Sequence, residues 1–405
     1  TTCPRRQHYR FSHQPVQRLA GRTSHPDPDQ SNLDEAGGPA ISSDKGLLPL
    51  PRLSRHPVRP CQTPQDPDDA GSMAPSVPQK TREIHSHHFD SEVWNDFPFR
   101  KDDVIIASYG KSGTTWSQQI VGALVHQDNP AANIQDLSPW LDLRVPPKEV
   151  KIAALEAQDH RRIIKTHLPV DALRMHPDVK YIYVARDGRD IAWSMFNHYS
   201  SGNDQWYAAV NDAPGRVGPP LPRMPKDCDV MQFYQTWLEK DGYPFWSLWD
   251  SVSTWWEIRH LPNVFIMHFN ELKEDLPGMM RKVAKFLEIP IQEDKWEATV
   301  EKCTFAWMKK NATSCAPLGG AFWDGGAGAF IYKGTNGRWR DMLSPQQVQE
   351  YEALAVEKLG PDCAHWLATG KMKRGMFGID WKGLAPKVLL VGVPVLLAVL
   401  ISKKM

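Results

Sequence analysis

Four short runs of branched apolar residues in the middle of the chain constrain its fold more than any other feature. They are Val104–Ser108, Arg162–Thr166, Lys180–Ala185 and Asn263–His268. Runs of this length and composition are typical of buried strands. Stretches with helical periodicity lie between or after them, at 114–127, 190–199, 229–238, 243–259 and 277–287. This alternation predicts an α/β fold, a single domain with a central, mostly parallel sheet that helices flank.

The sequence before this patterned region has a different composition. Residues 1–72 contain 11 of the 34 prolines but only two aromatic residues, Tyr9 and Phe11. Such a segment cannot bury enough apolar surface to offset its ordering entropy. We therefore predict a disordered leader at 1–72 and a folded domain at 73–375, beginning at Met73, the first methionine. A regulatory role for the leader is the alternative.

The segment 376–405 forms a C-terminal tail with a charge-free apolar run at 388–401, bounded by Lys387 and Lys403. This run is shorter than the roughly 20 residues that a membrane-spanning helix needs, and it contains Pro394. Two hypotheses follow for the tail. It anchors a cytoplasmic protein to a membrane that faces the cytosol, or it packs on the domain as a helix.

Charge and cysteine content exclude several classes of protein. The chain has 48 Lys and Arg against 47 Asp and Glu, for a formal net charge of +1. This balance excludes a nucleic-acid binder that relies on a polybasic face. The six cysteines are scattered without metal-ligand spacing, which indicates reduced thiols and predicts neither a metal site nor a disulfide framework.

The segment after the first run, SYGKSGTTW at 108–116, has the residues of a phosphate-binding loop. Its glycines let backbone N–H groups approach an anion at the start of the following helix, where the helix dipole adds positive potential. Lys111 adds a charge, and the hydroxyls of Thr114 and Thr115 add donors. The loop is P-loop-like but is not a Walker A motif, which requires glycine where Ile105 stands.

Polar residues also follow the second and third runs, and the carboxyl ends of parallel strands line the ligand crevice of an open sheet. Lys165 and His167 end the second run in IIKTHLP. A neutral histidine at this place is suited to take a proton from a hydroxyl near pH 7. Arg186 ends the third run in YVARDGRDIAWS, and Ser194 lies eight residues further on. These two side chains can meet over a second phosphate group.

Taken together, these motifs resemble the cytosolic-type sulfotransferase family, which depends on 3′-phosphoadenosine 5′-phosphosulfate (PAPS). KSGTTW, KTHLP and YVARDGRD followed by a serine match in order and spacing. FIYKGTNGRW at 330–339 is similar to the family's C-terminal RKGxxGDW loop. The resemblance covers about residues 83–370. It implies an enzyme that moves a sulfuryl group from PAPS to a hydroxyl of a small, lipophilic or aromatic acceptor, without a metal.

The resemblance also implies a role for each matching residue. The 5′-phosphosulfate would be held by Lys111, Ser112, Gly113, Thr114 and Thr115. The adenine would stack on Trp116 in a pocket completed by Thr304, Phe305, Met308 and Phe330. The 3′-phosphate would be bound by Arg186, Ser194, Lys333 and Gly334. The catalytic residues would be His167 as general base, with Lys111 and Lys165 stabilising the leaving phosphate and the transferring group.

The chain departs from the family pattern at three positions near these residues. Phe269 replaces a tyrosine near the 3′-phosphate region, Tyr332 replaces the arginine before Lys-Gly, and Arg338 replaces the aspartate of GDW. The substitutions leave the cofactor class standing but change the contacts expected around the 3′-phosphate. The family's short C-terminal dimerisation motif is not recognisable around 340–351, so the sequence leaves the oligomeric state open.

The acceptor pocket is less legible than the cofactor site. Aromatic candidates to line it are Phe97, Trp140, Trp193, Phe196, Trp206, Tyr207, Phe322 and Trp323, of which we expect about half to face substrate. The glycine-rich segment at 316–328 carries Phe322 and Trp323. It predicts a mobile loop that acts as a lid, with an ordinary surface loop as the alternative.

Two further hypotheses compete with the sulfotransferase. A nucleotide or small-molecule kinase could use the same phosphate loop, but the sequence lacks the full Walker A motif that would support it. A non-catalytic, membrane-tethered nucleotide-binding scaffold is the other. The presence of both Lys111 and His167 argues against that scaffold.

Overall fold

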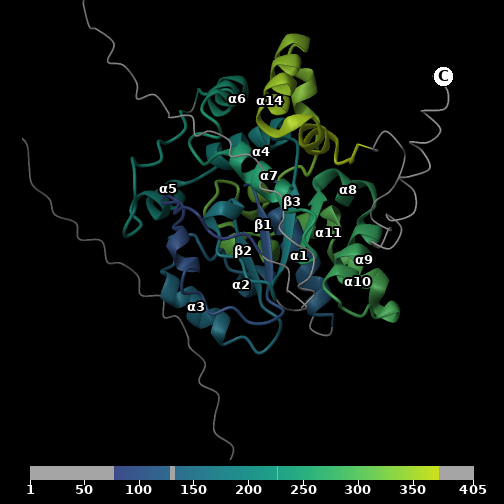
Figure 1. Cartoon of the computed structure of the whole chain (residues 1–405). Coiled ribbons are helices and arrows are strands. Elements are labelled where there is room, and N and C mark those ends of the chain that lie inside the picture. Colours follow the sequence, from purple (N-terminus) through teal and green to yellow (C-terminus); the bar gives the residue numbers. More distant parts are fainter. Residues whose placement is uncertain (1–76, 128–132, 226, 374–405) are drawn as a thin grey trace, which may run out of the picture. The chain divides into compact units, whose positions relative to one another are not determined.

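The computed structural model of the protein describes residues 77–127, 133–225 and 227–373. Four strands form one sheet at its centre (Figure 1). They are β1 (Val104–Ser108), β2 (Ile163–Thr166), β3 (Lys180–Ala185) and β4 (Val264–His268). The strand order is β2-β1-β3-β4, and all three neighbouring pairs are parallel. The chain thus passes from β1 to one side and then to the other, which places a ligand crevice at the carboxyl ends of these strands.

The two faces of the sheet pack against different helices because side chains alternate along each strand. Val104 and Ile106 of β1 belong to an aliphatic cluster, which includes residues of α1 (Thr114–Val125) and α9 (Leu276–Phe286). Ile105 and Ala107 belong to a second cluster, the aromatic cluster, which includes residues of α4 (Gly188–Ser200) and α7 (Leu248–Glu257). All five residues of β1 are buried, as expected for a parallel strand covered on both sides.

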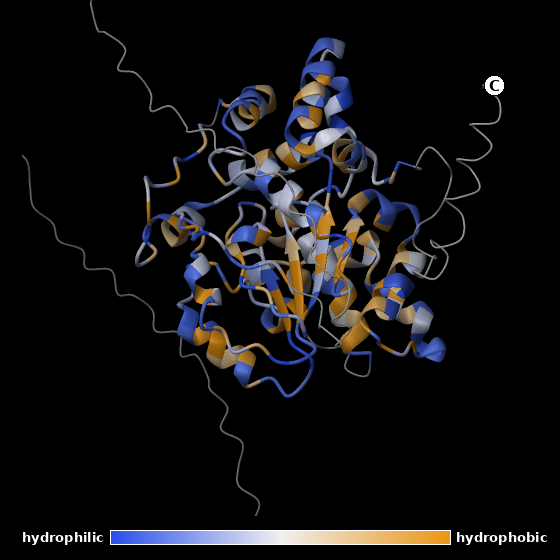
Figure 2. Ribbon diagram, in the orientation of Figure 1, coloured by the Kyte–Doolittle hydropathy of each residue, from blue (hydrophilic) through white to orange (hydrophobic). Residues whose placement is uncertain are grey.

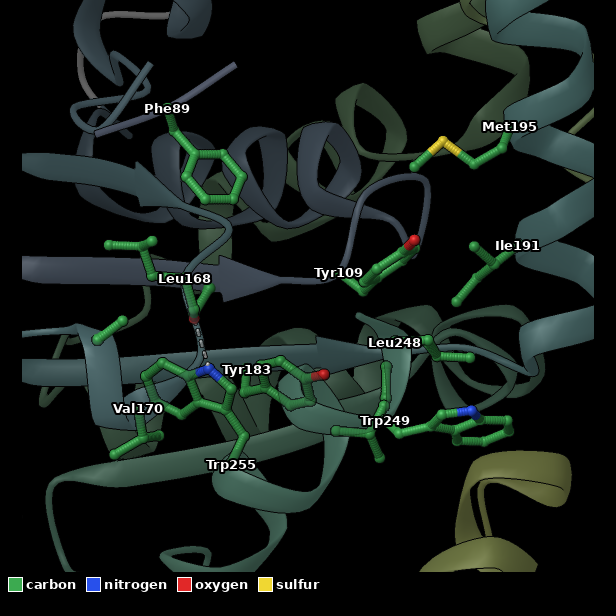
Figure 3. Packing of buried hydrophobic residues seen from close by; sticks show 14 of the residues in the cluster. Phe89, Tyr109, Leu168, Val170, Tyr183, Ile191, Met195, Leu248, Trp249 and Trp255 are labelled. Atoms are coloured by element: carbon green, nitrogen blue, oxygen red, sulfur yellow. Dashed lines mark hydrogen bonds between the residues drawn. The ribbon is translucent and has the colours of Figure 1, made fainter. Parts of the chain in front are cut away.

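The aromatic cluster fixes α7 against the sheet (Figure 3). The ring of Tyr183 on β3 stacks on Trp255 with centroids 5.3 Å apart, and the Trp255 Nε1–H donates to the Leu168 carbonyl at 3.1 Å. The strands are the most hydrophobic part of the molecule, and polar residues concentrate on the outer helices (Figure 2).

The other helices surround these two layers. The longer ones are α3 (Lys148–Glu156), α5 (Asp204–Asn211), α6 (Val230–Glu239), α10 (Trp296–Lys302) and α14 (Pro345–Thr369). The shorter ones are α2 (Ile134–Leu137), α8 (Phe269–Glu274), α11 (Phe305–Lys310), α12 (Ala312–Cys315) and α13 (Gly326–Phe330). Within the described residues there are also five 3₁₀ turns: η1 (Ser91–Trp94), η2 (Val170–Ala172), η3 (Glu293–Lys295), η4 (Pro317–Gly320) and η5 (Arg338–Asp341).

The predicted strands agree with the observed ones to within a residue, whereas one predicted helix is wrong at its start. The helix expected at 243–259 begins at Leu248, and a turn that includes Asp241 and Gly242, both with positive φ, precedes it. Ser247 then caps α7 by accepting from the Asp250 N–H at 3.0 Å. The glycine-rich segment at 316–328 contains η4 and the start of α13 rather than a single loop.

The predicted leader at 1–72 and the C-terminal tail, including its apolar run at 388–401, lie outside the described residues. Across 77–127, 133–225 and 227–373, no helix has both the length and the apolar character that crossing a bilayer requires.

Candidate active site

The loop between β1 and α1 has the conformation of an anion-binding turn. Lys111 has φ +65° and Gly113 has φ +113°, a region that favours glycine. A Cβ at position 113 would lie 2.9 Å from Phe269 Cδ2, so conformation and space both require glycine. No side chain in the described part of the chain caps α1, which leaves the N–H groups of its first turn available to an anion. Ser112 Oγ is buried there without a hydrogen-bond partner among the described residues.

His167 lies beside this loop, and its hydrogen bonds define its tautomer. Its Nδ1 is 2.6 Å from the Ser108 carbonyl oxygen, which can only accept, so Nδ1 carries the proton. The lone pair is therefore on Nε2, on the remaining side of a ring that lines the central cavity. Burial, followed by the charge of Lys165, holds the pKa of His167 well below its usual value. The imidazole is neutral at pH 7 and able to accept a proton at Nε2.

Two half-buried lysines, Lys111 and Lys165, lie near His167. Lys111 Nζ lies 4.4 Å from the centre of the Phe330 ring and 3.4 Å from His198 Nδ1. Lys165 Nζ lies 4.4 Å from the centre of the Trp140 ring. Burial lowers the pKa of Lys111 to about 7, helped by the charges of Lys165 and Arg186. Burial likewise lowers the pKa of Lys165 to about 8, against the opposing effect of Asp142.

Arg186 joins the end of β3 to a loop far away in sequence. Its guanidinium donates to the Lys111 carbonyl at 3.2 Å, the Thr335 carbonyl at 2.8 Å and Asn336 Oδ1 at 2.9 Å. All three partners are neutral acceptors. Burial is the main reason that the pKa of Arg186 falls to about 10. The guanidinium is therefore a buried cation whose charge these contacts leave uncompensated.

These groups line one cavity of about 520 Å³. Of the residues predicted from sequence, it is lined by Lys111, Gly113, Thr114, Thr115, Trp116, Lys165, His167, Arg186, Ser194, Phe305, Met308, Phe330, Lys333 and Gly334. We call the part with Lys111, Arg186, Lys333 and Arg338 the basic end. We call the part with Trp140, Trp206, Trp246 and Phe322 the aromatic end.

Two predicted site residues do not line the cavity. Ser112 is part of the loop, and its side chain is fully buried. Thr304 is the N-cap of α11, where its hydroxyl accepts from the Trp307 N–H at 3.2 Å and donates to the Glu301 carbonyl at 2.8 Å. Capping uses both the donor and an acceptor position of that hydroxyl. Thr304 thus acts on the cavity through α11, whose Phe305 and Met308 face it.

Half of the predicted aromatic candidates line the cavity: Trp140, Trp206, Phe322 and Trp323. The other half lies in or against the aromatic cluster: Phe97, Trp193, Phe196 and Tyr207. Sequence reasoning missed the cavity residues His87, His88, His198, Phe245 and Trp246. His198 could have been found, because it lies four residues after Ser194 and so shares its face of α4. The others carry no comparable local signal.

The fold and the cavity define an α/β enzyme with a P-loop-like anion site beside a buried histidine. The sequence profile of the sulfotransferase domain matches residues 101–361, more than half of the chain. The chain therefore belongs to the sulfotransferase family. The prediction of a PAPS-dependent sulfotransferase is confirmed, and neither the kinase nor the non-catalytic scaffold is retained.

Individual relatives support this membership. A glycolipid sulfotransferase of Mycobacterium tuberculosis is 29% identical over 303 residues, which cover 70% of this chain and 92% of that protein. Sulfotransferase 1B1 of Mus musculus is 28% identical over 288 residues, covering 68% and 89%. A crystal structure of retinol dehydratase in complex with retinol and PAP has a TM-score of 0.52 and 25% identity, covering 66% of this chain and 84% of that one.

No group of three or more His, Cys, Asp or Glu side chains is arranged to hold a metal ion within the described ranges.

Proposed function

We propose that the protein transfers the sulfuryl group of PAPS to a hydroxyl of a small, lipophilic or aromatic acceptor, with His167 as general base. The observation that carries this proposal is the tautomer of His167. Because Nδ1 donates to the Ser108 carbonyl, Nε2 is the position that can take the acceptor's proton. Trp140 and Trp246 pack against the same ring, with centroids 4.6 and 5.4 Å away, and shield it from water.

The anion-binding residues fit the 5′-phosphosulfate of PAPS. Ser112 belongs to this loop, but its side chain is buried and does not line the cavity. The first-turn N–H groups of α1 have no side-chain cap in the described structure, and Gly113 allows close approach. We assign them to the phosphosulfate, together with Lys111, Thr114 and Thr115. When bound, PAPS supplies an activated sulfuryl group on a phosphate leaving group. Lys111 and Lys165 place positive charge where negative charge develops during such a transfer.

The nucleotide end of PAPS fits other residues that line the same cavity. Trp116 is held for stacking, because its indole N–H donates to the Cys303 carbonyl at 2.7 Å. We assign the adenine pocket to Trp116 with Phe305, Met308 and Phe330, supported by Thr304 through its cap. The 3′-phosphate is assigned to Arg186, Ser194, Lys333 and Gly334, because Arg186 ties the loop of Lys333 and Gly334 to the end of β3, and Ser194 lines the same cavity from α4.

The aromatic end supports the acceptor class. Aromatic walls with few polar groups suit a lipophilic or aromatic molecule better than a highly charged one. At this end Lys165 packs on the Trp140 ring. Histidines whose pKa values burial lowers, including His88 and His198, also line the cavity. They can hydrogen-bond to a hydroxyl without adding charge to the pocket.

A transfer assay tests the proposal. The full chain is incubated with ³⁵S-labelled PAPS and a panel of a simple phenol, a sterol and a glycolipid. We expect labelled product with at least one lipophilic or aromatic member, and inhibition by PAP, the desulfated product. Transfer only to a highly charged acceptor would refute the acceptor class, and no transfer with tight binding of ATP–Mg instead of PAP would refute the donor.

A further inference from the structure

The late loop at 332–338 carries two of the departures from the family pattern, and they occur together. Tyr332 stands where the family has arginine, which removes a guanidinium from the region of the 3′-phosphate. Arg338 stands where the family has aspartate, which adds a guanidinium six residues later. The two changes conserve the number of guanidinium groups in the loop and remove an acid.

The loop holds its shape through hydrogen bonds along its length. Lys273 Nζ donates to the Gly334 carbonyl at 3.1 Å, and Arg186 holds the Thr335 carbonyl and the side chain of Asn336. Asp190 Oδ1 accepts from the Gly337 N–H at 2.7 Å. The residue directly before Arg338 is therefore fixed to the first turn of α4. Because this backbone is held in place, the position of the Arg338 Cα, from which the side chain extends, is defined.

Arg338 points from this position into the basic end. It lines the cavity together with Arg186 and Lys333. Its Cζ lies 5.6 Å from the centre of the Tyr332 ring, so the new guanidinium lies over the residue that replaced the old one. Its Nε is buried and has no hydrogen-bond partner among the described residues. A buried donor of this kind is costly unless a ligand satisfies it.

The electrostatics of the basic end also call for an anion. The charge of Arg338 contributes to the lowered pKa of Arg186, after burial. The charge of Asp190 favours both guanidinium cations, but its carboxylate accepts from the Gly337 N–H, and burial raises its pKa, which disfavours the anion. Two guanidinium groups that repel each other across a cavity are stabilised by a multiply charged oxyanion between them, because each can bind it through parallel N–H···O bonds.

We propose that Arg338 supplies the second guanidinium that binds the 3′-phosphate of PAPS, in place of the family arginine that Tyr332 has displaced. This inference rests on the proposed function, because it assigns a new residue to the same donor site. The family motifs do not assign a role to an arginine at position 338, and only the structure identifies Arg338 as a residue that binds PAPS.

The test compares two nucleotides that differ only in the 3′-phosphate. Binding of PAP and of AMP to the full chain is measured by isothermal titration calorimetry, for the native sequence and for Arg338→Ala. We expect Arg338→Ala to weaken PAP binding by roughly 10- to 100-fold, as for loss of a charge-assisted contact, and AMP binding by less than about 3-fold. Arg340→Ala is the matched control, because Arg340 is exposed, packs on Trp339 and does not line the cavity.

A rescue variant guards against misfolding as the cause. Tyr332→Arg introduced into Arg338→Ala restores the family arrangement and should recover most of the lost PAP affinity. Equal weakening of PAP and AMP by Arg338→Ala, or an unchanged PAP affinity, would overturn the inference, and so would the absence of any rescue. If the native chain bound PAP and AMP equally, the proposed function itself would fail, which is a distinct result.

Discussion

The basic and aromatic ends of the cavity are built in different ways. In the basic end, charged side chains leave the backbone at strand ends and turns, and backbone carbonyls hold them, as Lys111 and Thr335 hold Arg186. In the aromatic end, rings hold one another. Trp246 contacts the rings of Trp140 and Phe245 at 6.2 and 5.8 Å, and few hydrogen bonds are involved. Backbone hydrogen bonds thus position charge, whereas ring packing sets shape.

This difference predicts different consequences of substitution. A change in the basic end should alter affinity for anions, in a manner that depends on pH and on the number of phosphates. A change in the aromatic end should alter recognition of the acceptor and leave nucleotide affinity unchanged. The residue at the junction of the two ends, His167, should affect the chemical step itself.

The largest effect is expected for His167→Ala. Loss of a positioned general base should reduce turnover by about two to four orders of magnitude, with little change in PAP affinity. Single-turnover transfer from labelled PAPS measures the rate of the chemical step, and calorimetry measures the affinity for PAP. His160→Ala, which alters a histidine that does not line the cavity, should retain activity. If PAP affinity fell together with turnover, His167 would take part in nucleotide binding, as the residues of the basic end do.

Arg186→Ala should have the next largest effect, and it should distinguish a nucleotide with a 3′-phosphate from one without it. Because Arg186 holds the late loop as well as facing the cavity, PAP affinity should fall by at least about 30-fold. AMP, which lacks the 3′-phosphate, should lose much less. Competition of each nucleotide with labelled PAP gives both values. An equal loss for PAP and AMP would mean that Arg186 recognises some other part of the nucleotide.

The charge of Lys111 should make nucleotide affinity depend on pH. Burial and neighbouring cations lower its pKa to about 7 in the free protein, so its charge is present below that pH and lost above it. A bound anion favours the charged form and raises this pKa, so PAP affinity should fall by about 10-fold as the pH rises from about 7 to about 9. Proton uptake, measured by calorimetry in buffers of different ionisation enthalpy, should accompany binding.

Lys111→Ala provides the control for this pH dependence. The variant should bind PAP more weakly at about pH 6 and show a shallower decline above pH 7. Part of the decline should persist, because the pKa of Lys165, at about 8, falls in the same range. An unchanged slope would assign the titration to Lys165 rather than Lys111.

The smallest effect is expected for Trp140→Ala in the aromatic end. Removing this ring deletes one wall of the acceptor pocket and the surface against which Lys165 packs. The KM for the acceptor should rise about 3- to 10-fold, and PAP affinity should stay within about 2-fold, because the ring does not contact the basic end. Initial rates at varied acceptor concentration measure this. A large loss of PAP affinity would show that the two ends are coupled.

Most of the fold and of the basic end could be predicted from sequence because their determinants are contiguous. Apolar runs of five or six residues define the strands, and the loop at 109–113 immediately follows one of them. Lys111, Gly113 and His167 lie one to five residues after a strand end. The carboxyl ends of parallel strands meet at one edge of the sheet, so a linear motif after each strand locates a site in space.

The strands, the order of the motifs and the residues that follow each strand could all be read from the amino-acid sequence. Only the tertiary structure brought Asn336 to Arg186, 150 residues away, and placed Arg338 over Tyr332. Only it divided the aromatic residues between core and cavity, because a ring at helical spacing packs wherever neighbouring elements leave space. A local motif predicts the position of a side chain when the neighbouring backbone holds it. When side chains distant in sequence hold it, its position depends on how the helices pack.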